Sequence, residues 1–461
     1  MTTGTLRLAT RGSDLALRQA AGVREALSTR RRDVELVEVE TRGDELDEAL
    51  ITELGRTGAF VRALDEEVLS GEVDAAVHSL KDMPTDLPEG LVVAAVGERA
   101  PAGDALVTRA GGGLADLPRG AVVGTSSLRR KAQLLAEHPD LEVRPLRGNV
   151  DTRLQKLIAA DLQAEHERRI EAEANHEGDP DVREEDSEAR NASDGRATQQ
   201  RKEDERTVEE WFDDLSEFQR GALEYDLDHE YDAVVLAEAG LRRSELFYRD
   251  EYEVERLDRA DHVPAPGQGA VAVTASDPEV VETVRSALDD EPTRVAVSVE
   301  RTVLSELGGG CIAPIGINAL VQGEHVKTTV RVLSADGGTE VRSTRDLPLR
   351  TYREAAAEFA AALREQGAAE LIAAAKRSAD TDDAKRAEED SEARSASDGR
   401  AARPRDPEDE GGDSAERPGS EPNRERGDPG ADEPSDEGDD GTDDADGEAD
   451  PADADPEAVE E

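Results

Sequence analysis

The chain has 461 residues, of which 109 are Asp or Glu and 56 are Lys or Arg, giving a formal charge of −53. This charge argues against a general nucleic-acid binder and against electrostatic docking on anionic membranes, because both need a basic surface. Only 36% of the residues are hydrophobic and one is a cysteine, so part of the chain should stay outside a packed core, and an internal disulfide is excluded.

Strands and helices are predicted to alternate over the first part of the chain. A turn at Arg11-Gly12-Ser13 is followed by a helix from Asp14, whose apolar residues lie roughly on one side. Such alternation is typical of an α/β sheet covered by helices on both faces. The predicted strands of this part are 6–10, 34–40, 73–79 and 91–97.

The same pattern continues over residues 103–160. Strands are predicted at 121–125 and 141–146. A helix capped by Ser126 or Ser127 follows the first of them, and another helix begins at about Val150.

Three further features are predicted before residue 378. Residues 207–223 form an amphipathic helix, and residues 231–241 a strand followed by a loop. A third unit spans 292–376. Its predicted features are an apolar segment at 295–299, a helix at 300–307, the loop GGGCIAPIG, strands at 316–322 and 326–334, and a long helix over 352–376.

Acidic residues are concentrated in two segments. Residues 161–230 contain 25 acidic against 9 basic side chains, and residues 402–461 contain 25 against 5. Both are poor in apolar residues, so they cannot bury enough surface to offset chain entropy. Residues 184–197 and 388–401 differ at one position, and we interpret this near-repeat as a duplicated spacer or, alternatively, as a docking motif for one partner.

The composition also indicates the environment. Lysine is scarce, with 7 Lys against 49 Arg. An acidic, lysine-poor surface suits very high salt, where screening weakens self-repulsion, so a halophilic protein is expected. The chain has no apolar run of about 18 residues and no signal-peptide core, which predicts a cytoplasmic location without a membrane span.

Cationic and hydroxyl side chains follow several predicted strands. Open α/β sheets bind ligands beyond the carboxyl ends of their strands, where helix N-termini add positive potential. Arginine binds carboxylates and phosphates through paired hydrogen bonds, so the pattern predicts a polyanion site rather than unrelated surface ion pairs. The residues concerned are Arg11, Ser13, Lys81, Thr125, Ser126, Ser127, Arg129, Arg130, Arg147, Arg153, Arg242 and Arg243, and the acidic Asp82 lies among them.

Two residues suggest chemistry beyond anion binding. Asp82, beside Lys81, suits a reaction in which positive charge or an acidic N–H develops, although it could instead cap the turn before Pro84. Cys311 follows three glycines. It is either a small buried hydrophobe or a nucleophile or covalent attachment point. The seven His residues show no metal-ligand spacing, so no metal is expected.

Seven segments, taken together and in this order, resemble the hydroxymethylbilane synthase (porphobilinogen deaminase) family. They are LRLATRGSDLALRQA, HSLKDMP, GTSSLRRKAQL, LRGNVDTRLQKL, YDAVVLAEAGLRR, PAPGQGAVAV and ERTVLSELGGGCIAPIG. The resemblance covers about residues 5–160 and 230–376. The acidic insertion before YDAVVLA and the tail after about 378 depart from the family pattern.

The resemblance implies an α/β fold with two periplasmic-binding-protein-like (type II) domains joined by hinges, plus a small α+β domain. The first domain is discontinuous, because the chain crosses back to it near PAPGQGAVAV. The implied divisions are domain 1 at 4–98 and 268–288, domain 2 at 103–263 with an acidic, partly disordered insertion at 163–228, a cofactor-attachment domain at 292–377, and a disordered acidic tail at 378–461.

The resemblance also implies the reaction. Four porphobilinogen molecules condense head to tail with loss of ammonia on a covalent dipyrromethane primer, and water releases linear hydroxymethylbilane. The thioether attachment falls on Cys311, and catalysis on Asp82 with Lys81. Positions matching substrate and cofactor contacts are Arg11, Ser13, Gln19, Thr125, Ser127, Arg129, Arg130, Arg147, Arg153, Arg243 and Gln268, and those matching a mobile loop over the cleft are Asp44 and Phe60.

The implied partner is porphobilinogen, with no nucleic acid or membrane, and the implied state is a monomer. Two alternatives remain open: a non-catalytic polycarboxylate-binding module of the same fold, and a tetrapyrrole-binding paralogue without turnover. The binding module has no use for Asp82 or for a chain attached to Cys311. A dipyrromethane adduct on that cysteine supports the enzyme, and unmodified protein points to a binder.

Overall fold

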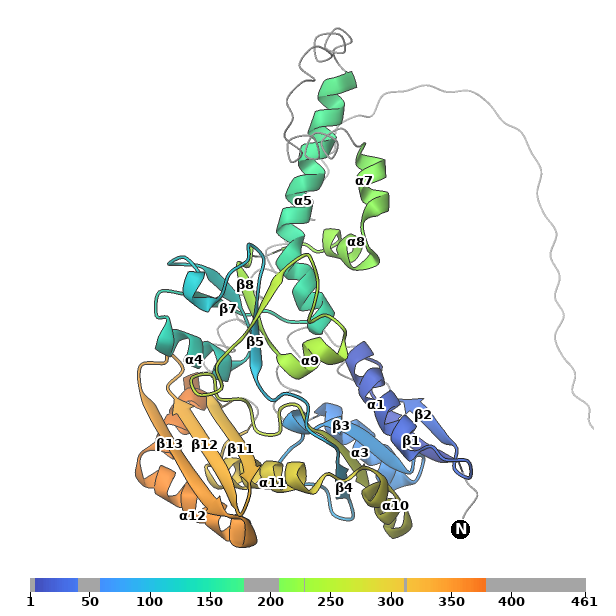
Figure 1. Ribbon diagram of the computed structural model, residues 1–461, viewed down its shortest axis with the longest axis vertical. Helices are drawn as coiled ribbons and strands as arrows, with labels where there is room; N and C mark the ends of the chain where they lie inside the picture. Colours follow the sequence, from blue (N-terminus) through green and yellow to red (C-terminus); the bar gives the residue numbers. More distant parts are fainter. Residues whose placement is uncertain (1–4, 40–58, 178–206, 228, 311–312, 379–461) are drawn as a thin grey trace, which may run out of the picture. The chain divides into compact units, whose positions relative to one another are not determined.

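A computed structural model describes residues 5–39, 59–177, 207–227, 229–310 and 313–378 (Figure 1). Within these residues the strands form two five-stranded sheets and one three-stranded sheet, with helices packed on each. This confirms the expected α/β class, whereas the domain boundaries stay a prediction. The tail and both copies of the near-repeat lie outside the described residues.

The first sheet has the strand order β2-β1-β3-β10-β4. β1 (Leu6–Thr10), β2 (Val34–Glu38) and β3 (Ala75–Ser79) are parallel. β10 (Val271–Ala275) runs antiparallel between β3 and β4 (Val92–Val96). The chain therefore returns to this sheet after building the second one.

Helices cover both faces of the first sheet. α1 (Asp14–Leu27) and α10 (Pro278–Leu288) pack on one face, where Leu8 is fully buried. α3 (Ala59–Ser70) packs on the other, against Ala9. Neighbouring residues of β1 thus face opposite cores, as a strand covered on both sides requires.

The second sheet has the order β7-β6-β8-β5-β9. β6 (Val122–Gly124), β7 (Glu142–Arg144) and β8 (Ala233–Ala237) are parallel. β5 (Asp104–Thr108) is antiparallel to both β8 and β9 (Glu253–Arg256).

Three helices follow strands of the second sheet: α4 (Leu128–Glu137), α5 (Val150–Glu177) and α9 (Glu238–Arg243). The loop predicted after the strand in 231–241 is wrong, because α9 begins directly at the end of β8. The buried Glu238 carboxylate accepts a hydrogen bond from Arg242 Nε, four residues on, at 2.7 Å. This pairing within the first turn stabilises a helix too short to show an apolar period.

Both ends of the acidic insertion are helical, and its partial disorder stays a prediction. α5 continues past residue 163, and 207–223 forms α7 (Val208–Asp214) and α8 (Glu217–Leu223) instead of one helix. Thr207 and Glu210 form a capping box at the start of α7, and Ser216 and Gln219 form a second one that starts α8 as a separate helix. Both helices lie beside α5 (Figure 1), and residues 178–206 are outside the described part.

The third sheet has three antiparallel strands, β11 (Ile315–Gln322), β12 (His325–Leu333) and β13 (Glu340–Pro348), not the two predicted. β13 is an edge strand in which only Val341 and Leu347 are buried. Charged residues occupy most of its other positions, so the sequence shows no alternation of apolar and polar residues that would predict a strand here.

Helices of the third unit also differ from the predictions. α11 (Glu291–Glu306) includes both the apolar segment and the separately predicted helix, and its buried Val295, Val299 and Val303 share a core with β11 and β12. The long helix ends as α12 (Tyr352–Glu365), and helical structure resumes over 368–378. Gly367 in the break has a φ of 94°, which only glycine adopts readily. Among the described helices, none is both long and apolar enough to cross a membrane.

Candidate active site

Two cavities adjoin each other beside the carboxyl ends of β1, β3 and β8. Cavity 1 has a volume of about 560 Å³ and cavity 2 of about 430 Å³. Both are lined by Lys81, Asp82, Arg130, Arg153 and Gln268, which we call the shared wall. Sequence reasoning had assigned these five residues to one site, and the structure brings them together.

Cavity 2 is built around the N-terminus of α1. Arg11, Ser13 and Gln19 line it from the turn after β1 and from α1, and Arg243 lines it from α9. Ser13 occupies the N-cap position of α1, yet its side chain makes no capping hydrogen bond. Burial lowers the pKa of Arg243, whose Nη2 donates to Gly269 O at 2.8 Å. A hydroxyl, a helix N-terminus and two guanidinium groups therefore converge on a space suited to carboxylates.

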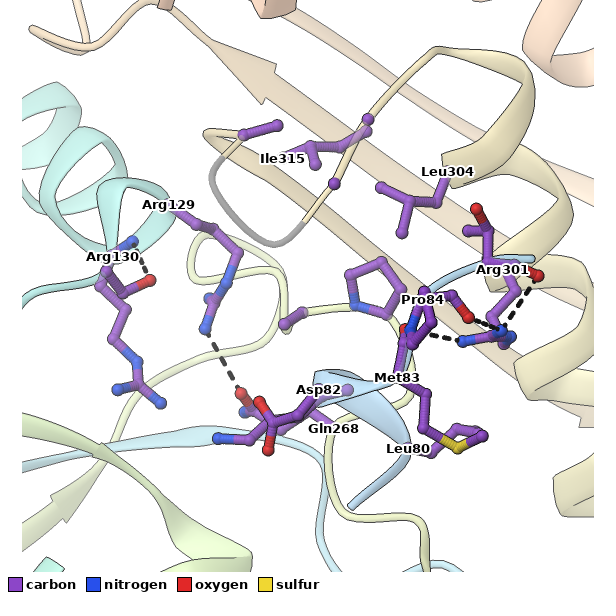
Figure 2. Close-up of a pocket in the computed structure, with 18 of the residues that line it drawn as sticks. Leu80, Asp82, Met83, Pro84, Arg129, Arg130, Gln268, Arg301, Leu304 and Ile315 are labelled. Carbon is purple, nitrogen blue, oxygen red and sulfur yellow. Dashed lines mark hydrogen bonds between the residues drawn. The ribbon is translucent and has the colours of Figure 1, made fainter. Parts of the chain in front are cut away.

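Cavity 1 is lined by segments that connect strands in each of the three sheets (Figure 2). Ser127 and Arg129 line it from the start of α4, and Arg301 from α11. Its apolar lining includes Leu80, Met83, Pro84, Pro266, Leu304 and Ile315. This combination of cations and apolar surface fits a ligand with flat hydrophobic rings and several negative charges.

Asp82 is held at the shared wall by its backbone neighbours. It ends a short 3₁₀ turn (Leu80–Asp82) after β3. Leu80 in this turn and Met83 directly after it are buried, while Asp82 is exposed. Leu80 N donates to Ala270 O at 3.1 Å. Arg301 donates to Met83 O at 3.2 Å and also to the carbonyls of Pro84 and Thr85. The carboxylate is thus presented from a fixed backbone (Figure 2).

Asp82 and Arg153 influence each other electrostatically. Burial, together with the charge of Arg130, lowers the pKa of Arg153 to about 10, and the negative charge of Asp82 opposes this shift. Arg153 Nε also donates to Gly148 O at 2.8 Å. The shared wall therefore combines a carboxylate with crowded cations, and an anionic ligand would relieve the repulsion among them.

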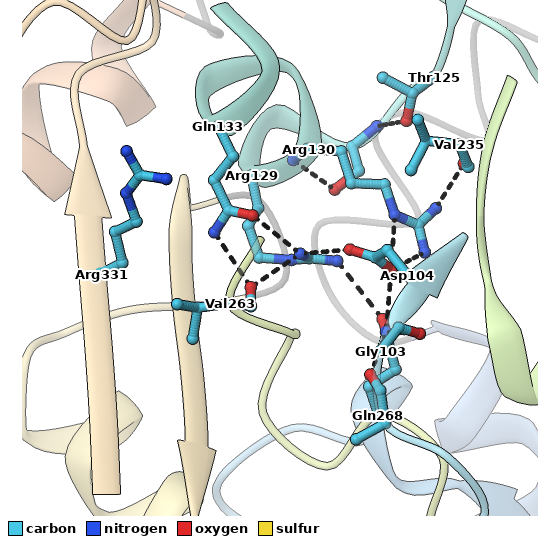
Figure 3. Close-up of polar contacts among 12 residues, drawn as sticks. Gly103, Asp104, Thr125, Arg129, Arg130, Gln133, Val235, Val263, Gln268 and Arg331 are labelled. Atoms are coloured by element: carbon cyan, nitrogen blue, oxygen red, sulfur yellow. Dashed lines mark hydrogen bonds and ion pairs between the residues drawn. The ribbon is translucent and has the colours of Figure 1, made fainter. Parts of the chain in front are cut away.

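A buried carboxylate that sequence reasoning missed organises two of these cations (Figure 3). Asp104, at the start of β5 and 1% exposed, accepts hydrogen bonds from Arg129 Nη1 at 2.7 Å and Arg130 Nη2 at 2.9 Å. Burial alone would raise the pKa of Asp104, but the two guanidinium groups hold it well below its usual range. The cluster retains a net positive charge at the wall of both cavities.

Removing this carboxylate is expected to destabilise the protein strongly. Asp104→Ala leaves two buried guanidinium groups without their shared partner, which should lower the free energy of unfolding by about 3–5 kcal/mol. Urea unfolding at constant high salt measures this, with Asp104→Asn as the variant that keeps shape but not charge. Because the folded-state pKa lies below the unfolded value of about 3.9, the stabilisation is present above that pH and is lost as pH falls through the folded-state pKa. An alanine variant within about 0.5 kcal/mol of wild type would contradict the assignment.

Gln268 has a structural role at the shared wall. Its Nε2 donates to Ala102 O at 2.6 Å and to Asp104 Oδ1 at 2.9 Å, so it ties the two segments that connect the first and second sheets. The next residue, Gly269, has a φ of 87°, and a Cβ there would lie 2.5 Å from Ala100 O. The crossing of the two segments therefore requires glycine at this position.

Five other assigned residues do not line either cavity, or cannot be placed. One of them, Arg242, lines neither cavity and donates from Nε to Glu238 Oε1 at 2.7 Å. Thr125 is buried and accepts a hydrogen bond from Ser127 N at 3.2 Å. Thr125 and Arg147 line neither cavity, so their ligand contacts stay predictions. Asp44 lies outside the described residues, and Phe60 is the second residue of α3, with its side chain undescribed.

Cys311 also lies outside the described residues. The described residues on either side of it, Gly310 and Ala313, line cavity 1. Arg62 on α3 and Arg301 on α11 line the same cavity and were missed. No predicted strand end precedes either residue, so the rule that located the other cations could not find them.

Family comparisons agree with this architecture. Residues 6–166 and 219–282 match the family described as "Porphobilinogen deaminase, dipyromethane cofactor binding domain". Residues 295–364 match "Porphobilinogen deaminase, C-terminal domain". The gap between the first two matched ranges contains the acidic insertion.

Individual relatives match over most of their length. A probable porphobilinogen deaminase of Halobacterium salinarum is 53% identical over 81% of this chain and 98% of its own. A porphobilinogen deaminase of Desulforudis audaxviator is 37% identical over 79% of this chain and 96% of its own. A TRAP periplasmic solute-binding protein of Ochrobactrum anthropi, covering 82% of this chain and 96% of its own, has 11% identity and a TM-score of 0.27, too low to support an argument.

Proposed function

The chain belongs to the porphobilinogen deaminase family, and we propose that the two adjoining cavities form its active site, centred on Asp82. The activity of the family is hydroxymethylbilane synthesis, a transferase reaction in which porphobilinogen units are joined with loss of ammonia. The observation that carries the proposal is the shared wall, where one exposed carboxylate stands among cations contributed by separate segments of the chain.

The cavities fit the dipyrromethane cofactor of this family. Each of its pyrrole rings carries an acetate and a propionate. Cavity 1 and the shared wall offer Lys81, Arg129, Arg130 and Arg153 for such carboxylates, and apolar side chains for the ring faces. When bound, the group supplies the primer to which substrate units are joined. We assign its thioether attachment to Cys311, because the residues on either side of that cysteine line cavity 1.

Asp82 is assigned the catalytic role. Loss of ammonia from the aminomethyl group of porphobilinogen leaves positive charge on the substrate pyrrole. A carboxylate at this point stabilises that charge and accepts a hydrogen bond from the pyrrole N–H. Lys81 and Arg153 then orient the carboxylates of the substrate, which keeps the reacting carbon near Asp82.

The two cavities are assigned different ligands. Cavity 2, with Arg11, Ser13, Gln19 and Arg243, receives the incoming porphobilinogen. Cavity 1, which borders the Cys311 loop, holds the attached chain. Asp82 faces both and therefore lies where the two must meet.

Mass spectrometry of the intact protein tests the function. The purified protein should carry the mass of a dipyrromethane. Limiting porphobilinogen should then produce a ladder of masses, each higher by one substrate unit less ammonia. Protein with neither adduct nor ladder would support the alternative of a non-catalytic polycarboxylate or tetrapyrrole binder.

The environment and state of the protein stay proposals. Adaptation to high salt is supported by the excess of acidic residues and the scarcity of lysine, whereas the cytoplasmic location and the monomeric state rest on the sequence predictions alone. The melting temperature should rise by about 10 °C or more between dilute buffer and molar KCl, because salt screens the repulsion among carboxylates. Equal melting temperatures in the two buffers would contradict the halophilic assignment.

A further inference from the structure

The protein must hold a product chain that grows by one pyrrole ring at each addition. Where it holds the added rings is inferred here on the basis of the proposed function. Each addition forms one carbon–carbon bond between the methylene carbon of porphobilinogen and the free α-carbon of the terminal ring. The aminomethyl C–N bond breaks, and the α-proton leaves with the ammonia. Because Asp82 is one group at one place and the other end of the chain stays attached, every added ring must be stored between them.

Cavity 1 is the space available for that storage. Asp82 lies on its shared wall, while Gly309, Gly310 and Ala313 border it next to the attachment residue. Its volume is about 560 Å³, and Leu304 and Ile315 add apolar surface on the side of the third unit. Stored rings would therefore extend toward α11 and α3.

Stored rings bring two carboxylates each, and most cations that line cavity 1 already have partners within the protein. Arg129 and Arg130 share Asp104. Arg301 donates to the carbonyls of Met83 and Thr85. These groups can balance the first carboxylates, but additional rings require further positive charge.

Arg62 differs from these cations in its contacts with the described residues. It projects from the first turns of α3, is exposed, and lines cavity 1 together with Arg301 and Leu304. Among the contacts of the described residues, none is a hydrogen bond or ion pair of its guanidinium group. We propose that Arg62 forms a carboxylate subsite for the later rings, one that is filled only as the chain lengthens.

The test follows the lengths of the covalent complexes in Arg62→Ala. Porphobilinogen is added in limiting portions, and the intact masses are recorded after rapid quenching. The first addition should proceed within about twofold of wild type, because the shared wall is unchanged. The last additions should slow by about tenfold, the effect of one charge-assisted hydrogen bond, so that complexes near full length accumulate.

Two variants sharpen the result. Arg62→Lys keeps the charge and should restore most of the wild-type ladder. Arg285→Ala removes an exposed arginine of α10 that lines neither cavity, and it should leave the ladder unchanged.

A ladder in Arg62→Ala identical to that of wild type would overturn the proposal, and so would a uniform slowing from the first addition onward. Thermal unfolding confirms that the variant is folded, as expected for an exposed side chain. Failure of the proposed function looks different, because wild-type protein itself would then show no ladder.

Discussion

Asp82→Ala is expected to lower turnover by about a thousandfold while the protein stays folded. Among the residues that the structure describes, Asp82 is the one acidic residue that lines both cavities. It stands where positive charge develops as ammonia leaves the substrate, and an alanine there offers neither charge nor a hydrogen-bond acceptor. The loss should appear in kcat more than in KM, because the cations that bind the substrate carboxylates remain.

Folding should survive because the anchors of this turn do not use the carboxylate. Leu80 and Met83 are buried, and Arg301 contacts backbone carbonyls of residues 83–85. Asp82 itself is exposed. Product formation from porphobilinogen and thermal unfolding, measured side by side, check both halves of the expectation.

Asp86→Ala is the matched control for this experiment. Asp86 is an exposed carboxylate four residues further on that lines neither cavity, so its loss should leave turnover unchanged. Asp82→Glu retains the charge at a different reach and should fall between wild type and alanine. Wild-type turnover in Asp82→Ala would remove Asp82 from the catalytic role.

Much of the site could be predicted because the rule that locates it is local. Parallel strands place their carboxyl ends at one edge of a sheet, so residues that follow β1 and β3 meet in the first sheet, and those that follow β6 and β8 meet in the second. Arg11, Lys81, Asp82 and Arg243 follow these strands, and they line the cavities. Their assignment needed only the positions of the strands, which apolar segments reveal.

Asp104 could not be predicted because its role depends on tertiary pairing. It begins an apolar strand and reads as an ordinary polar residue at a strand boundary. Only the antiparallel pairing of β5 with β8 brings it beneath α4, where Arg129 and Arg130 converge on it. A carboxylate at the first position of a short strand whose next three residues are apolar was the one available signal.

Helix capping by side chains explains why the predicted single helix over 207–223 forms two helices. Two capping boxes in succession divide 207–223 into α7 and α8, although the apolar spacing continues through both. The apolar period predicted that the segment packs, and Trp211 does stack on His166 of α5 at 5.8 Å between ring centroids. The spacing of apolar residues therefore predicts which face of a segment is buried better than it predicts where a helix ends.

Cys311→Ser is expected to yield folded protein that carries no stable dipyrromethane. A thiol ionises readily and is a strong nucleophile, whereas a serine hydroxyl of similar size stays protonated and reacts poorly without a general base. With no attached chain, the covalent ladder cannot form, and turnover should fall below detection.

The control for Cys311→Ser must alter the same region without touching the thiol. Ser305→Ala changes an exposed hydroxyl near the end of α11, lines neither cavity, and should leave loading complete. Intact mass compares the adduct in wild type and both variants, and thermal unfolding shows whether loading stabilises the protein. If Cys311→Ser carries the same adduct as wild type, the attachment lies on another residue, and the direction in which cavity 1 stores the growing chain must be assigned again from that residue.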